Sequence, residues 1–312
     1  MVLSVAQAGK NLGSDPGVAA YLKEISQQHG LDHQHLRNLF ADVSVQDDVI
    51  KLISTPSERT LTWSEYRAIF LTEKRIRGGL EFVEKHRVLL DRAEAQYGVP
   101  ADIIAAIIGV ETAYGQITGN HRALSALATL AFAYPPRASF FRKELTEFLL
   151  LAGEEGFDPG QVKGSYAAAM GMPQFISSSY RQYAIDFDND GRRDLWDSPA
   201  DVIGSVANYF TAHGWRPGEA IAEKVTPTGG DWLALVTKSL KPTHDDQMLL
   251  RSGLKPLHTT PGKKSVMVFE RNNQSESWIG HKNFYVITRY NHSRMYAMAV
   301  FQLSQILREA GV

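Results

Sequence analysis

Cysteine is absent from this sequence of 312 residues. Without it, the protein has no disulfide, no thiolate nucleophile and no zinc site built from cysteine. The absence does not decide the location of the protein, because it is compatible with the cytoplasm and with an oxidising compartment.

A long apolar run and an excess of charge of either sign are also missing. No stretch of about 18 apolar residues occurs, which excludes a membrane-spanning helix. The apolar stretch within residues 1–13 is too short for a complete signal peptide, so we expect a cytosolic chain or an exported one whose signal is absent. The 33 basic and 34 acidic side chains give a net charge of −1. This balance argues against a dedicated binder of nucleic acid or of anionic membranes.

The apolar spacing of the first 215 residues predicts mostly helices. One helix is expected from Asp15-Pro16 to His29-Gly30, and Thr62 is placed to cap another. A longer amphipathic helix is expected over 73–96, closed by Tyr97-Gly98.

The pattern changes between residues 218 and about 282. Glycines and prolines there separate short runs such as 265–270, whose β-branched and aromatic residues are typical of a strand. Helical spacing returns over 293–308. These patterns predict an α+β, mainly α fold, with a small β-rich module inserted between helical parts of one core.

The helix expected from Pro100 to Glu111 is apolar on nearly every side and ends in an acid. Helical spacing places Glu111 on the same face as Ile104, Ile107 and Ile108. An ionised carboxylate there is costly to desolvate, so we expect Glu111 to face a cleft with a raised pKa. An acid that is protonated near neutral pH is what a glycosidase needs to protonate a leaving sugar. An exposed glutamate in a frayed last turn is the alternative.

Three ordered blocks of the chain carry a more specific signal. They are residues 107–112 (IIGVET) followed by Tyr114, Gly115 and Gly119, residues 163–176 (KGSYAAAMGMPQFI), and residues 288–293 (TRYNHS) with Tyr296. Together they resemble the motifs of lytic transglycosylases, most of all the membrane-bound lytic transglycosylase B family and its soluble relatives. The resemblance extends over about residues 60–305.

Three positions depart from the family pattern. Ala168 stands where a glycine is common, and Ser177 where a proline is common. Pro135-Pro136-Arg137 replaces a segment that often carries paired arginines. Arg137 is therefore left as the single basic residue near an expected peptide-binding subsite, and a preference for stem peptides is not predicted.

The resemblance implies roles for individual residues. Glu111 is implied to be the catalytic acid, Ser165 to hydrogen-bond near the N-acetyl group of the muramic sugar, and Gln174 to line the cleft near Glu111. The implied substrate-binding residues also include Tyr66, Tyr209, Tyr290, Asn291 and Tyr296. Without the resemblance, core packing of the tyrosines and helix capping by Asn291 would be the simpler interpretations.

An acidic segment predicts a calcium loop. Asp186, Asp188 and Asp190 occupy positions 1, 3 and 5 of an EF-hand pattern, with Gly191 at position 6 and the carbonyl of Arg192 at position 7. We expect calcium to stabilise the fold rather than take part in catalysis. Sodium is an alternative ion, and a solvated acidic turn without an ion is the alternative interpretation.

The closing half of this loop departs from the EF-hand pattern. Position 12 is Asp197, whose side chain is shorter than the usual glutamate. Ser198-Pro199 is expected to start the exiting helix, which puts Asp201 in its first turn. We therefore predict Asp201 as the last ligand of an enlarged loop, 186–201, with Asp197 as the alternative.

The family implies a mechanism with one carboxylate, whereas retaining glycosidases with a protein nucleophile use two. Glu154 and Glu155, which we interpret as an exposed turn, are not expected to act as the second. Glu111 is implied to protonate the bond between MurNAc and GlcNAc, and then to take the proton of the C6 hydroxyl as a 1,6-anhydro ring closes. No organic cofactor is needed. Rival hypotheses are a hydrolytic muramidase, a non-catalytic, calcium-stabilised peptidoglycan-binding protein, and an EF-hand sensor.

The implied fold is a lysozyme-like core with a helical N-terminal extension. The implied partners are peptidoglycan strands, with other cell-wall enzymes as further candidates, and the implied location is the periplasm of a Gram-negative cell. The predicted segments are a helical N-terminal region (1–75), a catalytic core (76–217), a β-rich module (218–283) and a C-terminal return to the core (284–312).

Overall fold

The computed structural model describes residues 9–55, 60–237, 239–271 and 274–311. This part of the chain is mostly helical with small antiparallel sheets, which confirms the predicted fold class. Two compact units are formed. The first consists of the described residues of Met1–Pro56 and Ile117–Gln182, and the second of those of Ser57–Gln116 and Tyr183–Val312. The boundaries of the four predicted segments do not coincide with those of the two units, because each unit is assembled from two separated stretches of chain.

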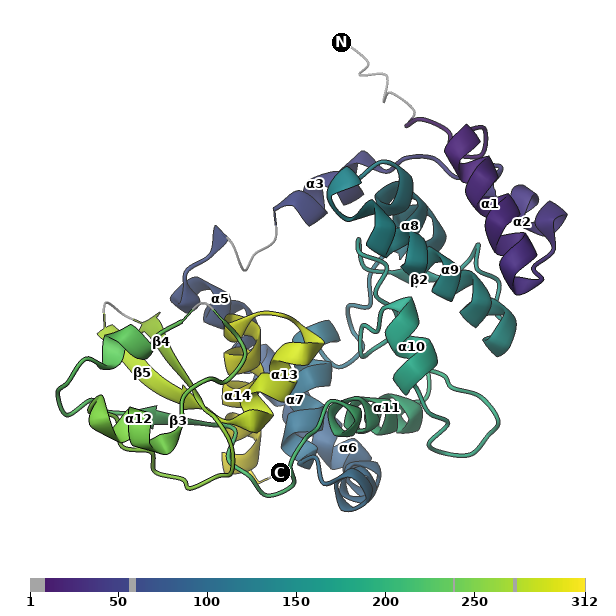
Figure 1. Ribbon diagram of the computed structural model, residues 1–312. Helices are drawn as coiled ribbons and strands as arrows, with labels where there is room; N and C mark the ends of the chain where they lie inside the picture. The colour runs from purple at the N-terminus through teal and green to yellow at the C-terminus, as the bar shows by residue number, and fades with distance from the viewer. Residues whose placement is uncertain (1–8, 56–59, 238, 272–273, 312) are drawn as a thin grey trace, which may run out of the picture. The chain divides into compact units, whose positions relative to one another are not determined.

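In the first unit, the apolar helix α8 packs against α9. Its two short strands pair antiparallel, with His121 opposite Gly164. A Cβ atom on Gly119 would lie 2.1 Å from the carbonyl oxygen of Gly164, and Gly119 has a φ of +99°, so glycine is required at this approach. The elements of this unit (Figure 1) are α1 (Pro16–His29), α2 (His33–Phe40), α3 (Asp47–Ser54), β1 (His121–Arg122), α8 (Ala123–Phe132), η1 (Pro135–Arg137), α9 (Ala138–Glu155), β2 (Lys163–Gly164) and most of α10 (Ser177–Tyr183).

The predicted turn at Glu154 and Glu155 is instead the end of a helix, although Glu154 is exposed as expected. Helix α9 continues through Gly153 and ends at Glu155, with Gly156 in the left-handed conformation as its C-cap. A glycine inside a helix costs only about 1 kcal/mol relative to alanine, which the buried face of α9 outweighs. Glu154 forms an ion pair with Arg181 at 2.6 Å.

The second unit begins with helices whose ends follow the sequence signals. Thr62 and Glu65 form a capping box at the start of α5, and Gly98 caps α6 in the left-handed conformation. The elements are α5 (Trp63–Phe70), α6 (Glu73–Tyr97), α7 (Ala101–Thr112), α11 (Pro199–Ala212), β3 (Ala222–Val225), η2 (Trp232–Leu235), α12 (Asp246–Arg251), β4 (Ser265–Arg271), β5 (Gln274–Gly280), α13 (Lys282–Tyr290) and α14 (Arg294–Glu309).

Helix α7 is buried along nearly its whole length. Every residue from Asp102 to Val110 is buried, because α7 packs against both α6 and α14 (Figure 1). Burial of one isoleucine contributes about 1.5–3 kcal/mol, so α7 is a major part of the core. Asp102 lies in the first turn, where the helix dipole favours an acid, and accepts hydrogen bonds of 3.0 and 2.9 Å from Arg308 of α14. The predicted buried helix is confirmed.

The β-rich module is a three-stranded antiparallel sheet in the order β3-β5-β4. The predicted strand at 265–270 is confirmed as β4, and α14 is the predicted C-terminal helix. One face of the sheet packs on a small apolar cluster of its own. The cluster consists of Val225, Leu235, Leu249, Leu254, Val266 and Ile279.

A buried carboxylate ties the sheet to the loop before β4. Glu223 of β3 accepts hydrogen bonds from the backbone N–H groups of Leu257 (2.7 Å) and His258 (3.1 Å). Its other oxygen lies 2.9 Å from Nε2 of the buried His281, whose Nδ1 is 2.7 Å from the Thr260 hydroxyl. Each donor would be costly to bury without an acceptor.

We predict that Glu223→Gln destabilises the protein. An amide replaces one acceptor oxygen with donors, so that either the buried His281 or the backbone N–H groups of Leu257 and His258 lose their acceptor, at a cost of about 1–3 kcal/mol. Glu276→Gln on β5 is the matched control, because Glu276 pairs with the 57% exposed Lys224 and should contribute less than about 1 kcal/mol. Urea unfolding measures both, and equal stabilities of the two variants would contradict the assigned role.

Candidate active site

The carboxyl group of Glu111 lies at the end of the buried helix. Glu111 is in the last turn of α7 and is half-buried, so it is not in a frayed turn open to water. The phenol of Tyr296, on α14, donates a hydrogen bond of 2.5 Å to its Oε1 atom. Ser293 caps α14 by accepting from the backbone N–H of Tyr296, which fixes the start of the helix that carries the phenol. The acid is therefore held by a residue 185 positions away.

Further tyrosines of the predicted site lie around this pair. The ring of Tyr290 stacks on that of Tyr296, with centroids 6.4 Å apart and planes 11° apart. Tyr209 contacts Tyr290 at 4.8 Å and donates a 2.7 Å hydrogen bond to the carbonyl of Arg289. Tyr66 is buried and packs on Phe70.

The surroundings of the acid keep these phenols protonated. Burial raises the pKa of Tyr290 and Tyr296 well above the ordinary value, and the negative charge of Glu111 raises both further. Burial also raises the pKa of Tyr209. Tyr296 is therefore the hydrogen-bond donor to Glu111 at physiological pH. The charge of Glu111 is a further cause of the raised pKa of Tyr209.

Asn291 follows α13 as its C-cap and has an extended backbone. Its carbonyl accepts a 2.7 Å hydrogen bond from the backbone N–H of Ser293, so it shapes the turn that leads into α14. Its predicted contact with substrate stays a prediction.

Ser165, of the first unit, has both of its acceptor sites in use. Its hydroxyl oxygen accepts from the backbone N–H groups of Ala167 (3.3 Å) and Ala169 (3.1 Å). A hydroxyl that accepts twice retains one proton to donate. This arrangement suits a donor to a ligand oxygen, although the predicted contact with an N-acetyl group is not tested by it.

Gln174, also of the first unit, braces its own loop. Its side-chain amide donates 3.0 Å hydrogen bonds to the carbonyls of Thr118 and Gly171. Gln174 itself has a φ of +50°, which is rare for a residue with a side chain. We expected the Gln174 side chain to hydrogen-bond either to substrate or to backbone. Both of these hydrogen bonds are to backbone carbonyls.

Arg137 ends the short helix η1 and is exposed. Its guanidinium lies over the rings of Phe140 and Phe141, at 4.4 and 5.1 Å from their centroids. A cation held on two aromatic faces is positioned but retains its charge for a ligand. The role of Arg137 in binding substrate stays a prediction.

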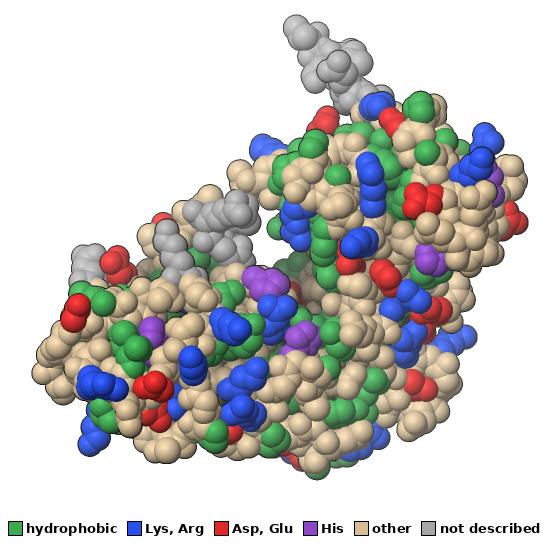
Figure 2. All heavy atoms as spheres, viewed as in Figure 1, with side chains coloured by type: hydrophobic (Ala, Val, Ile, Leu, Met, Phe, Trp, Pro, Cys, Tyr) green, Lys and Arg blue, Asp and Glu red, His purple; other side chains and the backbone are tan. Residues whose placement is uncertain are grey.

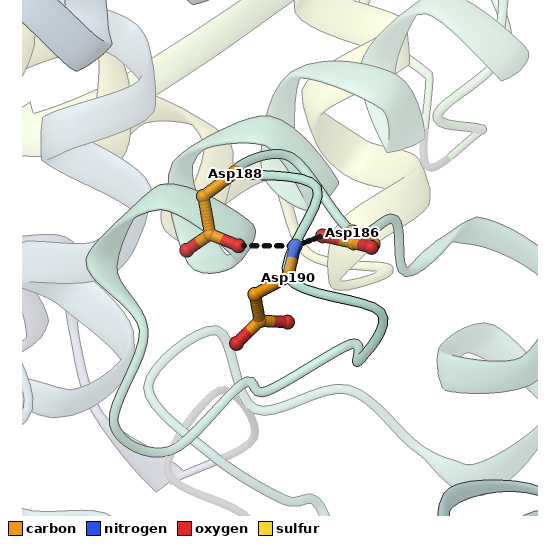
Figure 3. A group of neighbouring side chains, drawn as sticks. All are labelled: Asp186, Asp188 and Asp190. Carbon is orange, nitrogen blue, oxygen red and sulfur yellow. Dashed lines mark hydrogen bonds between the residues drawn. The ribbon is translucent and has the colours of Figure 1, made fainter.

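The acidic loop has its three aspartates together. Ligand oxygens of Asp186, Asp188 and Asp190 all lie within 4.8 Å of one another. Asp186 and Asp188 both point toward the backbone nitrogen of Asp190, which donates to them at 3.0 and 3.3 Å (Figure 3). Gly191, with a φ of +91°, turns the chain at the position that the EF-hand pattern reserves for glycine. Three carboxylates in so small a space repel one another, and a divalent cation removes that repulsion.

Asp201 and Asp197 differ in their surroundings. Asp201 is fully buried in the first turn of α11, and its two oxygens accept from the backbone N–H groups of Phe187 (2.7 Å) and Asp194 (2.8 Å). Burial raises the pKa of Asp201. Asp197 is exposed. Asp201 thus ties the two ends of the loop to α11, which sequence reasoning did not foresee.

An acid at the end of a buried helix, held by a phenol and close to stacked tyrosines, matches the arrangement expected of the acid in a glycosidase-type site of the lysozyme-like class. The family model described as "Transglycosylase SLT domain" matches residues 13–305. The chain therefore belongs to this family.

Individual relatives agree with that assignment. Membrane-bound lytic murein transglycosylase B of Escherichia coli (strain K12) is 39% identical over 320 residues, which are 99% of this chain and 87% of the relative. The crystal structure of soluble lytic transglycosylase SltB1 from Pseudomonas aeruginosa is 47% identical, with a TM-score of 0.90, over 95% of this chain and 99% of that one. The Escherichia coli lytic transglycosylase Slt35 in complex with calcium is 40% identical, with a TM-score of 0.88, over 99% of both chains. The activity of this chain is that of a lytic transglycosylase of peptidoglycan.

Figure 2 shows acidic and basic side chains distributed over the visible face. Among the described helices, none combines the length and the apolar character needed to cross a membrane.

We predict that Tyr296→Phe lowers kcat by about 10- to 100-fold, because a hydrogen bond to a charged group contributes about 1.5–3 kcal/mol. The hydrogen bond that Tyr296 donates favours the ionised form of the carboxylate, and the variant lacks this bond. Without it, the acid keeps its proton to higher pH, and the alkaline limb of the pH–rate profile moves upward. Tyr285→Phe is the control, since its ring lies beside Lys282 and Arg289. Equal rates and identical profiles for both variants would contradict this arrangement.

Proposed function

We propose that Glu111 alone supplies the acid and the base of the lytic reaction at the bond between MurNAc and GlcNAc. In the first step the Glu111 carboxyl donates its proton to the glycosidic oxygen as the bond from that oxygen to C1 of MurNAc breaks. The positive charge that develops at C1 is stabilised by the oxygen of the sugar's own N-acetyl group, and Ser165 is the proposed hydrogen-bond donor to that group.

In the second step the C6 hydroxyl of the same MurNAc attacks C1 and forms the 1,6-anhydro ring. Its proton returns to the Glu111 carboxylate, so the enzyme ends in its starting state and no water is consumed. The Tyr296 phenol supports the carboxylate between the two steps, because a hydrogen bond to a charged acceptor is stronger than one to a neutral acceptor.

The observation that carries this proposal is the hydrogen bond from the phenol of Tyr296 to the Glu111 carboxylate. A retaining mechanism with a protein nucleophile needs a second carboxyl group about 5–5.5 Å from the acid. Glu154, the other acid considered from the sequence, is engaged by Arg181 in the first unit. A proton that is given and then recovered by one group requires no second acid.

We predict that Glu111→Gln abolishes turnover of purified peptidoglycan, whereas Glu154→Gln retains it. Mass spectrometry of the products from the unaltered enzyme should show ends that are lighter by one water than those of hydrolysis. Turnover by Glu111→Gln would refute the catalytic assignment. Ends that carry the added water would instead identify a hydrolytic muramidase.

We further propose that calcium occupies the loop at 186–201 and stabilises the second unit. The ligands would be the carboxylates of Asp186, Asp188 and Asp190, the carbonyl of Arg192, and Asp201 in preference to Asp197. The convergence of the three carboxylates supports Asp186, Asp188 and Asp190 as ligands, and oxygen-only ligands match the chemistry of calcium. A bound ion would neutralise the negative charges of the aspartates in this loop, which Asp201 anchors to α11.

We predict that calcium raises both the melting temperature and the free energy of unfolding, and that the increment in free energy grows with calcium concentration to about 2.7 kcal/mol at about 100 times Kd. Asp188→Asn should remove this increment while leaving kcat unchanged well below the melting temperature. Asp201→Asn should also remove the increment, and Asp197→Asn should retain it. The reverse result for the last two variants would make Asp197 the ligand, and an unchanged increment in Asp188→Asn would refute the site.

The location and further contacts of the enzyme follow from its substrate. Peptidoglycan lies in the periplasm of a Gram-negative cell, and we propose that location for this chain. The structure of SltB3 from Pseudomonas aeruginosa, 29% identical, holds a NAG-NAM-pentapeptide. For this chain we propose that Arg137 meets the carboxylates of the stem peptide, and other cell-wall enzymes are proposed as partners.

A further inference from the structure

The last turn of α7 ends in a backbone conformation that its sequence does not favour. Ala113 and Tyr114, the two residues that follow the helix, both have positive φ angles, 49° and 62°. Left-handed backbone costs a residue with a side chain about 1–2 kcal/mol. The N–H groups of these residues bond to the carbonyls of Gly109 (3.0 Å) and Ile108 (3.2 Å), which closes the helix end tightly. The Thr112 hydroxyl accepts from the N–H of Gly115 within the turn, and contacts from outside the turn add to it.

The ring of Tyr114 fills a slot made by three glycines. A Cβ atom added to Gly79 would lie 2.3 Å from the Tyr114 hydroxyl oxygen, and one added to Gly109 would lie 2.5 Å from it. One added to Gly78 would be 3.3 Å from the ring. Gly78 and Gly79 belong to α6 and Gly109 to α7, so the ring is inserted where the two helices lack side chains. Phe82 packs on the ring at 5.4 Å.

The hydroxyl of Tyr114 does not explain this placement. Its oxygen is buried and has no hydrogen-bond partner among the described residues. A buried hydroxyl without a partner costs stability, so the ring and its shape, rather than the hydroxyl, account for the fit.

A second group holds the same turn. The guanidinium of Arg75, on α6, donates to the carbonyl of Gly109 and, at 3.2 Å, to that of Val110. The Val110 carbonyl belongs to the peptide that leads into Glu111, and the Gly109 carbonyl, which also accepts from the N–H of Ala113, belongs to the peptide before it. Tyr114 follows Glu111 by three residues, and Arg75 binds the carbonyls of the two residues that precede Glu111.

We propose that Tyr114 is a positioning residue for the reaction, and that its ring in the slot of Gly78, Gly79 and Gly109 sets the direction of the Glu111 carboxyl toward Tyr296. The inference rests on the proposed role of Glu111 as the acid. The ring acts through the backbone of the helix end and touches no substrate. A displacement of about 1 Å at a reacting group lowers the rate by about 100-fold.

The test measures kcat and KM with a soluble glycan fragment, well below the melting temperature of each variant. Tyr114→Ala should lower kcat by about 100-fold and leave KM within about twofold. Tyr114→Phe should keep kcat and should be at least as stable to urea as the unaltered protein, because it removes a buried hydroxyl without a partner. Gly109→Ala, which puts a methyl group where the ring stands, should lower kcat as Tyr114→Ala does.

Leu249→Ala is the matched control for lost stability, since Leu249 is fully buried in the apolar cluster of the β-rich module. It should lower the free energy of unfolding and leave kcat unchanged. If Tyr114→Ala and Gly109→Ala lower only the stability, as Leu249→Ala does, the inference is overturned. A large loss of kcat in Tyr114→Phe would overturn it as well. Turnover by Glu111→Gln would refute the proposed acid instead, so the two failures are distinguishable.

Discussion

The hydrogen bond from the Tyr296 phenol to the Glu111 carboxyl is the contact on which the proposed site depends. It joins the end of α7 to the start of α14, and it can form only because both helices are buried against each other. The apolar residues of α7 provide that burial, and they also take Glu111 out of bulk water. The packing that stabilises the core therefore also creates the chemical environment of the acid.

Helix α14 reaches this position only after the chain has passed through the β-rich module. The module has its own apolar cluster and its own buried polar network around Glu223. It joins α13 through His281, which is bound to Glu223 and immediately precedes that helix. Helix α13 brings Tyr290 to the stack beside Tyr296. The module thus has a structural connection to the site, although it contributes none of the predicted catalytic groups.

Local sequence signals predicted much of this arrangement. Three features depend only on neighbours in sequence, and each is found in the structure. They are the helix starts capped by Asp15 and Thr62, the apolar helix before Glu111, and the aspartates of the acidic loop. Features that depend on distant contacts were not predicted. The slot for Tyr114 requires Gly79 and Gly109 to meet across two helices, and the anchoring by Asp201 requires α11 to pack under the loop. Each of the two units is assembled from stretches that are far apart in the chain, and no local sequence signal predicts this assembly.

The central claim is that one carboxyl group gives a proton and recovers one from the substrate itself. Cleavage of peptidoglycan in isotopically labelled water tests it most directly, because only attack by water brings solvent oxygen into the new sugar end. We predict that the MurNAc ends contain no labelled oxygen. Incorporation of the label into each new end would show that water closes the reaction, and would contradict the account.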